Sequence, residues 1–258
     1  MVFLDQPAFC LCFVPVKNGA AVTFGLESAN VVGYVNTELN QGFQPGGSSF
    51  AAISGGEYNI QDIKPIAPEG EAAGGWMFYI ADMDVGGSTS DQYVYLTTDD
   101  GVEKDGWYDA NDGETYIEGK SFKLGEGFYF STDFASDSKF MTSGEVNLNE
   151  LTISCEQGFC PRANPRPVDI DLQDIKPVPP EGEPAGGWMF YIADMDAGGS
   201  TSDQYVYLTE DDGVAKDGWY DANDGETYIS GKKFAPGQGF YFSCDYATGG
   251  TYFPAIEL

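Results

Sequence analysis

The sequence predicts an all-β protein with two tandem, near-identical β-sandwich domains of jelly-roll-like type and an N-terminal β-strand arm. Two observations lead to this prediction: a long internal repeat, and many short strand patterns separated by turn residues. The stretch 61–135 returns as 173–247, shifted by 112 positions without a gap, and 13 of its 75 positions differ. A repeat of this length indicates one structural unit that is encoded twice.

Short apolar or alternating runs within each copy are typical of β-strands. In the first copy they lie at 76–80, 92–97, 127–131 and 139–141. They are rich in aromatic and β-branched residues, and glycine, aspartate or proline breaks separate them. Many short strands with regular turn signals favour a sandwich or a barrel. Helical periodicity is nearly absent, and one short turn is expected over 59–63, before Pro65.

The repeat divides the 258 residues into two domains of ordinary size. We expect an arm or hairpin at 1–32, a first sandwich at 33–143 and a second sandwich at 144–258. The proline-rich connection 161–167 predicts a stiff, exposed polyproline segment that carries two arginines. It is either a solvated loop or a positive patch that docks on an acidic face of another copy.

The N-terminal arm has no counterpart in the second copy. Its apolar run contains Phe9, Leu11, Phe13 and Val14 and is typical of a strand buried on both faces. Two interpretations stay open. The arm closes the first domain as a hairpin, or it adds a strand to a neighbouring subunit.

The charge balance excludes several classes of partner. There are 12 basic and 41 acidic residues, which give a formal net charge of −29, and there is no histidine. A phosphate backbone and an anionic membrane surface would both be repelled. The absence of imidazole removes the commonest general base and transition-metal ligand. No apolar run has the length that a membrane span needs.

The location is suggested by composition alone. The start of the chain lacks the basic region of a secretory signal. The acidity, the scarcity of lysine and the richness in glycine, threonine and tyrosine still favour an extracellular or cell-surface protein.

Five cysteines stand at 10, 12, 155, 160 and 244, and none lies in the first long repeat, where Thr132 occupies the place of Cys244. Cys155 and Cys160 flank a four-residue segment, so a local disulfide is possible where strands pair there. A zinc cluster of Cys10, Cys12, Cys155 and Cys160 is the alternative, and the odd count leaves at least one thiol over.

Two acidic segments in each copy are the candidate metal sites. Closely spaced carboxylates in glycine-rich loops are the oxygen ligands that a calcium ion prefers, although the spacing is not that of an EF-hand. The candidate ligands of the first copy are Asp82, Asp84, Asp91, Asp99, Asp100, Asp105, Asp109, Asn111 and Asp112. Those of the second copy are Asp194, Asp196, Asp203, Asp211, Asp212, Asp217, Asp221, Asn223 and Asp224.

Other chemistries compete with calcium at these segments. Asp-Gly pairs are ordinary hairpin-turn residues. Trp76, Trp107 and the tyrosine-rich strands could instead stack on sugars, although large aromatics in a sandwich are more often core. Paired carboxylates could hydrolyse glycosides at the right separation, but the sequence singles out no pair.

The sequence therefore predicts a non-enzymatic structural protein. We expect it to self-assemble into a fibre, tube or layer, with copies of itself as partners and calcium in the aspartate-rich loops. The alternative is a secreted carbohydrate-binding or adhesin module whose two similar sites gain by avidity.

Overall fold

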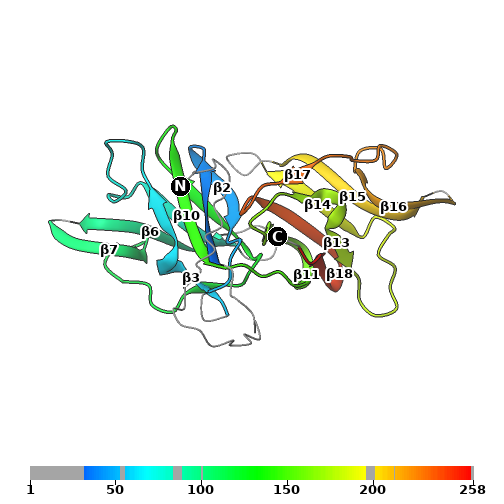
Figure 1. The fold of residues 1–258 in the computed structure, drawn as a ribbon, viewed down its shortest axis with the longest axis horizontal. Helices are drawn as coiled ribbons and strands as arrows, with labels where there is room; N and C mark the ends of the chain where they lie inside the picture. Colours follow the sequence, from blue (N-terminus) through cyan, green and yellow to red (C-terminus); the bar gives the residue numbers. More distant parts are fainter. Residues whose placement is uncertain are drawn as a thin grey trace, which may run out of the picture.

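The computed structural model describes residues 32–52, 56–83, 89–99, 101–195, 201–211 and 213–256, and over these ranges the protein is all-β (Figure 1). The predicted fold class is confirmed at this level, since the described chain forms several β-sheets and its helical elements are two short 3-10 turns. The first turn, Ile60–Asp62, falls where a short turn was expected. The predicted arm with Phe9, Leu11, Phe13 and Val14 lies outside the described residues.

The strands in the first half of the described chain form their ladders only with one another, and we call residues 32–145 unit 1. A three-stranded sheet has the order β1-β10-β4, a five-stranded sheet has the order β2-β9-β5-β6-β7, and β3 pairs with β8. The bounds are β1 Val32–Leu39, β2 Gly42–Gly47, β3 Tyr58–Asn59, β4 Lys64–Ile66, β5 Phe78–Met83, β6 Thr89–Asp99, β7 Val102–Asp109, β8 Ser121–Phe122, β9 Gly127–Thr132 and β10 Ser138–Glu145.

Residues 151–256 pair in the same way and form unit 2. A six-stranded sheet has the order β11-β18-β14-β15-β16, with β13 also on β18, and β12 pairs with β17. The bounds are β11 Leu151–Ala163, β12 Ile170–Asp171, the 3-10 turn η2 Leu172–Asp174, β13 Lys176–Val178, β14 Phe190–Met195, β15 Thr201–Asp211, β16 Val214–Asp221, β17 Lys233–Phe234 and β18 Gly239–Phe253.

The two units differ mainly at one corner. Strand β11 follows the path of β1 and then β2, and β18 follows the path of β9 and then β10. In unit 1 the chain leaves the sheet at Asn40–Gln41 and again at 133–137. In unit 2 both strands run through the corner, with a bulge between Glu156 and Gly158. A bulge lets a strand bend while it keeps its pairing.

Each unit has its own aromatic core. In unit 1 the ring of Phe140 on β10 stacks on that of Phe130 on β9, with centroids 3.8 Å apart, and Trp107 on β7 packs behind it. Trp107 and its equivalent Trp219 are fully buried, and each indole N–H donates to a backbone carbonyl, that of Ile63 or Ile175. These contacts join the two sheets of unit 1 as the layers of a sandwich-like arrangement.

One glutamine fastens the 3-10 turn of each unit to the sheet. The Gln61 amide donates to the carbonyls of Trp107 and Ile117, and its oxygen accepts from the Trp107 N–H at 2.9 Å. A Cβ at Gly106, where φ is 143°, would lie 2.5 Å from that oxygen, so only glycine fits there. Gln173 makes the same bonds in unit 2.

The expectation of an exposed connection at 161–167 is wrong. Pro161, Arg162 and Ala163 are part of β11, and Arg162 and Arg166 are 5% and 0% exposed. The Arg166 guanidinium donates to four backbone carbonyls, those of Asn147, Asn149, Phe253 and Pro254. A guanidinium has five N–H donors, and a buried one is tolerated where carbonyls satisfy them. These arginines are therefore not a surface patch.

Candidate functional site

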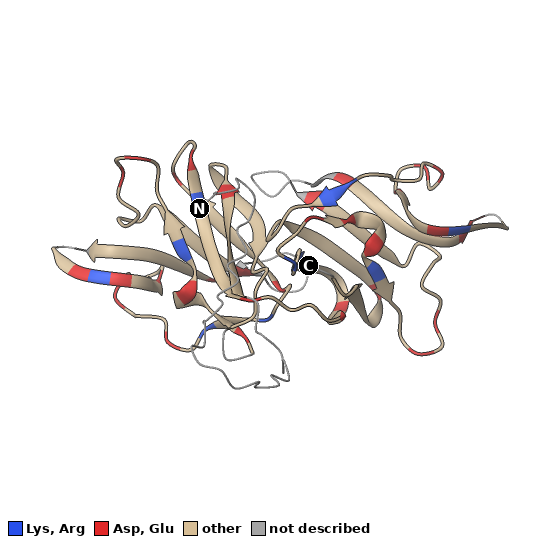
Figure 2. Cartoon of the chain, viewed as in Figure 1, with Lys and Arg blue, Asp and Glu red and all other residues tan. Residues whose placement is uncertain are grey.

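The predicted acidic ligands do not gather in one place. Figure 2 shows the acidic residues spread over the loops and hairpins of both units, and the hairpins β6–β7 and β15–β16 lie at opposite ends of the molecule (Figure 1). Among the described residues, no three acidic or thiol side chains are placed to hold one metal ion. Asp84, Asp100, Asp196 and Asp212 lie outside the described residues, and the side chain of Asp99 is not described.

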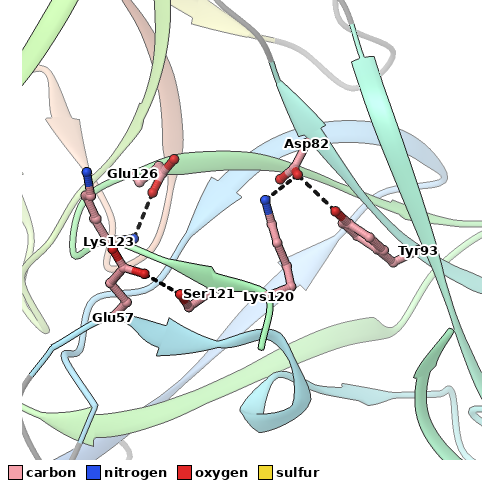
Figure 3. A network of polar contacts seen from close by, with 7 residues as sticks. All are labelled: Glu57, Asp82, Tyr93, Lys120, Ser121, Lys123 and Glu126. Carbon is pink, nitrogen blue, oxygen red and sulfur yellow. Dashed lines mark hydrogen bonds and ion pairs between the residues drawn. The ribbon is translucent and has the colours of Figure 1, made fainter. Parts of the chain in front are cut away.

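Asp82 lies at the centre of a polar network on the sheet of unit 1 (Figure 3). Its carboxylate accepts a hydrogen bond from the Tyr93 hydroxyl at 3.0 Å and forms an ion pair with Lys120. The network has a copy in unit 2, where Asp194 accepts from Tyr205 at 3.0 Å and pairs with Lys232. Both units therefore contain the same tyrosine–aspartate hydrogen bond between neighbouring strands, with a lysine paired to the aspartate.

A second tyrosine on the same strand is bonded in the same way. The Tyr95 hydroxyl donates to Asp105 at 2.8 Å, and the Tyr207 hydroxyl donates to Asp217 at 2.7 Å. Burial raises the pKa of Tyr93 and Tyr95, and the bonded carboxylates raise it further. These phenols stay protonated at neutral pH and act as donors, so none of them is a candidate base.

The loop after β7 uses its acidic residues to build turns. Asp109 accepts from the backbone and side-chain N–H groups of Asn111 at 2.7 and 2.8 Å. Asp112 accepts from the backbone N–H of Glu114 at 2.8 Å and from both the N–H and the hydroxyl of Thr115. The bonds from Thr115 lower the pKa of Asp112. In unit 2, the same bonds involve Asp221, Asn223, Asp224, Glu226 and Thr227.

Three further candidate ligands lie apart from these networks. Asp91 and Asp203 are exposed residues of β6 and β15. Asp211 forms an ion pair with Lys216 at 2.9 Å. The bonds of Asp109, Asp112 and their equivalents are ordinary turn chemistry. Together with the tyrosine and lysine contacts, they account for most of the described carboxylates of the two segments.

The two tryptophan positions considered for sugar stacking have different surroundings. Trp107 is fully buried in the core, so it is not part of the sugar-stacking platform that was considered as an alternative. Trp76 and its equivalent Trp188 have φ values of 64° and 63°, a left-handed conformation that is rare for a bulky residue. Trp188 is 36% exposed, and its ring covers Gly225, where an added Cβ would lie 2.7 Å from the ring.

Cys155 and Cys160 form a disulfide, with their sulfur atoms 2.04 Å apart, that spans the bulge in β11 rather than a turn between strands. Cys244 is a free, buried thiol on β18, and burial raises its pKa. The disulfide lines a cavity of about 430 Å³ together with the buried Arg162 and with Glu126 from unit 1. Cys10 and Cys12 lie outside the described residues.

The contact between the two units escaped the sequence analysis. Ala81 and Tyr129 of unit 1 form one buried cluster with Ala193 and Tyr241 of unit 2, and Phe43 packs against it. Tyr129 lies between Phe128 and Phe130, whose rings are in the core, so it points to the opposite face of β9. The three consecutive aromatic residues 128–130 were a signal that this strand is covered on both faces.

Comparison of the chain with family models, with curated proteins and with solved structures found no match. Over the described residues, the structure has no helix that is long and apolar enough to cross a membrane.

Proposed function

We propose that the chain is a non-enzymatic structural protein of the cell exterior that assembles with copies of itself into a fibre, tube or layer. In this proposal the two units are tandem, near-identical β-sandwich domains that serve as one duplicated building block. The observation that carries it is that carboxylates of the acidic segments form hydrogen bonds and ion pairs within their own unit. The tyrosine, lysine and backbone bonds of Asp82, Asp105, Asp109 and Asp112, all repeated in unit 2, support the fold itself.

Three further features favour this function. A disulfide suits an oxidising compartment outside the cell. A formal charge of −29 requires counter-ions wherever acidic surfaces approach one another. Aromatic contacts within each core, such as Tyr95 on Trp107 and Tyr207 on Trp219, give both units the same packed interior.

Calcium enters the proposal as a bridge between copies. Within one copy the described carboxylates of the acidic segments lie apart. Carboxylates on the loops of two neighbouring copies can together supply the six to eight oxygens that calcium takes. The N-terminal arm, residues 1–32, is proposed as a strand that one copy adds to the next.

Electron microscopy of the purified chain in millimolar calcium, with an excess-chelator control, tests the proposal. Regular polymers that dissolve in chelator are expected. Polymers that survive chelation would keep the structural role and remove calcium from it. Dispersed particles under both conditions would contradict self-assembly. A chain that lacks residues 1–20 should stay folded and fail to polymerise, and unchanged polymers would rule out the arm as the joint.

A carbohydrate-binding module is the second candidate, and the left-handed Trp76 and Trp188 favour it. Strained backbone at a half-exposed aromatic residue, repeated in both units, is a feature that binding sites often carry. The test is a glycan array with the double variant Trp76→Ala and Trp188→Ala. The control replaces the exposed Val102 and Val214 at the hairpin ends by alanine. Glycan binding that is lost only in the tryptophan variant would support the module.

A further inference from the structure

The two units meet through contacts that come in reciprocal pairs. Residues 42–47 of β2 correspond to 158–163 of β11, because both pair in the same register with the equivalent strands β9 and β18. Gly46 bridges Gln238, and its equivalent Arg162 bridges Glu126, which is the equivalent of Gln238. In an isologous interface, residue i contacts j while j contacts i. The contact between the units follows this rule.

The backbone bonds across the interface repeat the same reciprocity. The Gly47 N–H donates to the Gly237 carbonyl at 3.1 Å, and the equivalent Ala163 N–H donates to the Gly125 carbonyl at the same distance. At the centre, the rings of Tyr129 and Tyr241 are 6.3 Å apart at 73°. The ring of Phe43 lies against Tyr129, and that of its equivalent Phe159 lies against Tyr241. One unit thus contacts the other as one subunit contacts its copy in a twofold dimer.

Gly47 and Ala163 break the symmetry at the point where a residue faces its own equivalent. A Cβ added to Gly47 would lie 2.5 Å from the Cβ of Ala163 and 2.7 Å from the carbonyl oxygen of Glu126. Carbon atoms at optimal contact are about 3.5–4.0 Å apart. Two copies of unit 2 would bring alanine against alanine there and overlap. Unit 1 against unit 2 avoids the overlap because one side is glycine.

Glu126 and Arg162 also distinguish the contact of unit 1 with unit 2 from a contact between two copies of unit 2. Burial lowers the pKa of Arg162 to about 10, and the nearby charge of Glu126 opposes this shift. Glu126 is replaced by Gln238 in the repeat, and Arg162 by Gly46. Two copies of unit 2 would therefore leave each buried arginine beside a neutral glutamine. A buried charge without an opposite charge is costly.

We propose that this face is a subunit-pairing surface on which unit 2 accepts only the unlike unit. A second copy of this chain joins the first by placing its unit 2 on unit 1 of the first copy. Reciprocal exchange of units gives a closed dimer, and exchange along a row gives an open chain. The inference rests on the proposed self-assembly and names a joint for it within the described residues.

Inter-copy disulfide trapping in the full-length chain tests the pairing. One population carries Glu126→Cys and a second carries Arg162→Cys, since these residues are bridge partners in antiparallel register and such pairs fit disulfide geometry. The two are unfolded and refolded together at high concentration, oxidised, and analysed by non-reducing electrophoresis and peptide mapping. A covalent dimer through residues 126 and 162 is expected in the mixture and in neither population alone.

The double variant Glu126→Cys with Arg162→Cys in one chain is the control for geometry and folding, and it should form the bond within the chain. If it does and the mixture gives no dimer, pairing stays within one chain and the inference is overturned. Dimers through residues 162 and 238 in a mixture of Arg162→Cys and Gln238→Cys chains would overturn the selectivity, because like pairing of unit 2 places these two residues opposite each other. Electron microscopy of the unmodified chain tests self-assembly separately. If polymers form but no disulfide joins two copies, the proposed function stands and this surface is not the contact between copies.

Discussion

Several carboxylates among the described residues are acceptors that hold two strands or a turn together. Asp82 receives a phenol hydrogen bond from the neighbouring strand and an ammonium from a loop, with its side chain 17% exposed. Charged acceptors make hydrogen bonds worth about 1.5–3 kcal/mol, more than neutral ones. The acidity of the sequence thus serves packing at such positions as well as solubility.

The first prediction concerns this carboxylate. We expect Asp82→Ala to lower the free energy of unfolding by about 1–3 kcal/mol, because it leaves the Tyr93 hydroxyl without its acceptor and Lys120 without its counter-charge. Urea denaturation, followed by tryptophan fluorescence, measures it. The repeat supplies a matched control in Glu118→Ser, since Ser230 occupies that place in unit 2. Equal effects of the two changes would contradict a structural role for Asp82.

The second prediction concerns the turn carboxylate Asp112. Its pKa is lowered from 3.8 because three hydrogen bonds from the next residues favour the charged form. A lowered pKa in the folded state means that the contribution to stability is present above about pH 4 and is lost as the pH falls through the lowered value. An NMR titration of the carboxyl carbon should give a midpoint below 3.8. Thr115→Val, which removes one of the bonds, should move that midpoint upward.

The turn role of Asp109 and Asp112 could be predicted from the sequence, since aspartate two or three residues before a backbone N–H is a local signal. The bond between Asp82 and Tyr93 could not. It depends on the register of β5 against β6, which shifts between Ala81 and Met83. A change of register by one residue would turn the tyrosine to the other face.

At the scale of elements, one glutamine makes three of the hydrogen bonds that hold each 3-10 turn to its sheet. Gln61 makes three hydrogen bonds to strand β7 and to the segment after it. None of these bonds follows a periodic pattern, so sequence reasoning had no means to find them. The turn itself was predicted from Pro65, and the structure confirms it as Ile60–Asp62.

The third prediction follows from this attachment. We expect Gln61→Leu to cost about 2–3 kcal/mol, from three hydrogen bonds of about 1 kcal/mol each, because the buried N–H of Trp107 loses its acceptor. Denaturation in urea measures the change. Gln44→Leu is the control, since that half-buried side chain makes only local bonds, with Glu38 and Asn40, and these bonds lie at the surface. A Gln61 variant as stable as the control would show that water replaces the amide.

The short central strands were predictable because segments rich in glycine, aspartate or proline separate their apolar runs. The prediction failed at 161–167, where three prolines favoured an extended, exposed connection. Pro161 is tolerated in β11 even though it cannot donate to a neighbouring strand, because β11 is the edge strand of its sheet and forms a ladder only with β18. Its backbone contacts with unit 1 are local ones at Arg162 and Ala163. The burial of Arg166 depends on four carbonyls from distant positions, which no local pattern reveals.

At the scale of the whole molecule, the two units bury equivalent faces against each other. The near identity of 61–135 and 173–247 predicts two similar units but not how they meet. The interface lies where the copies differ in single residues, at Gly47 and Ala163 and at Glu126 and Gln238. Those small differences decide which units fit, and they stand out only once both surfaces are placed together.

The fourth prediction uses the tyrosine at the centre of that interface. Burial raises the pKa of Tyr129 from 10.0 to about 12. The neutral phenol is favoured in the folded state, so its contribution is fully present below pH 10 and is lost as the pH rises through about 12. Tyr129→Phe keeps the ring against Phe43 and Tyr241 and removes the ionisable group. The variant should therefore lose less stability than the unmodified chain between pH 10 and 12.

Urea denaturation at several pH values in this range measures the difference, because other buried tyrosines titrate equally in both proteins. The comparison also reports on the contact between the units. If the face opened readily in solution, Tyr129 would be wetted and would ionise near its ordinary value, and the two proteins would lose stability in parallel. A shallower loss in the Phe variant, together with a tyrosinate absorbance change that coincides with unfolding, would mean that the paired face stays closed until the chain unfolds. Exchange between copies would then take place during folding rather than by opening of the finished molecule.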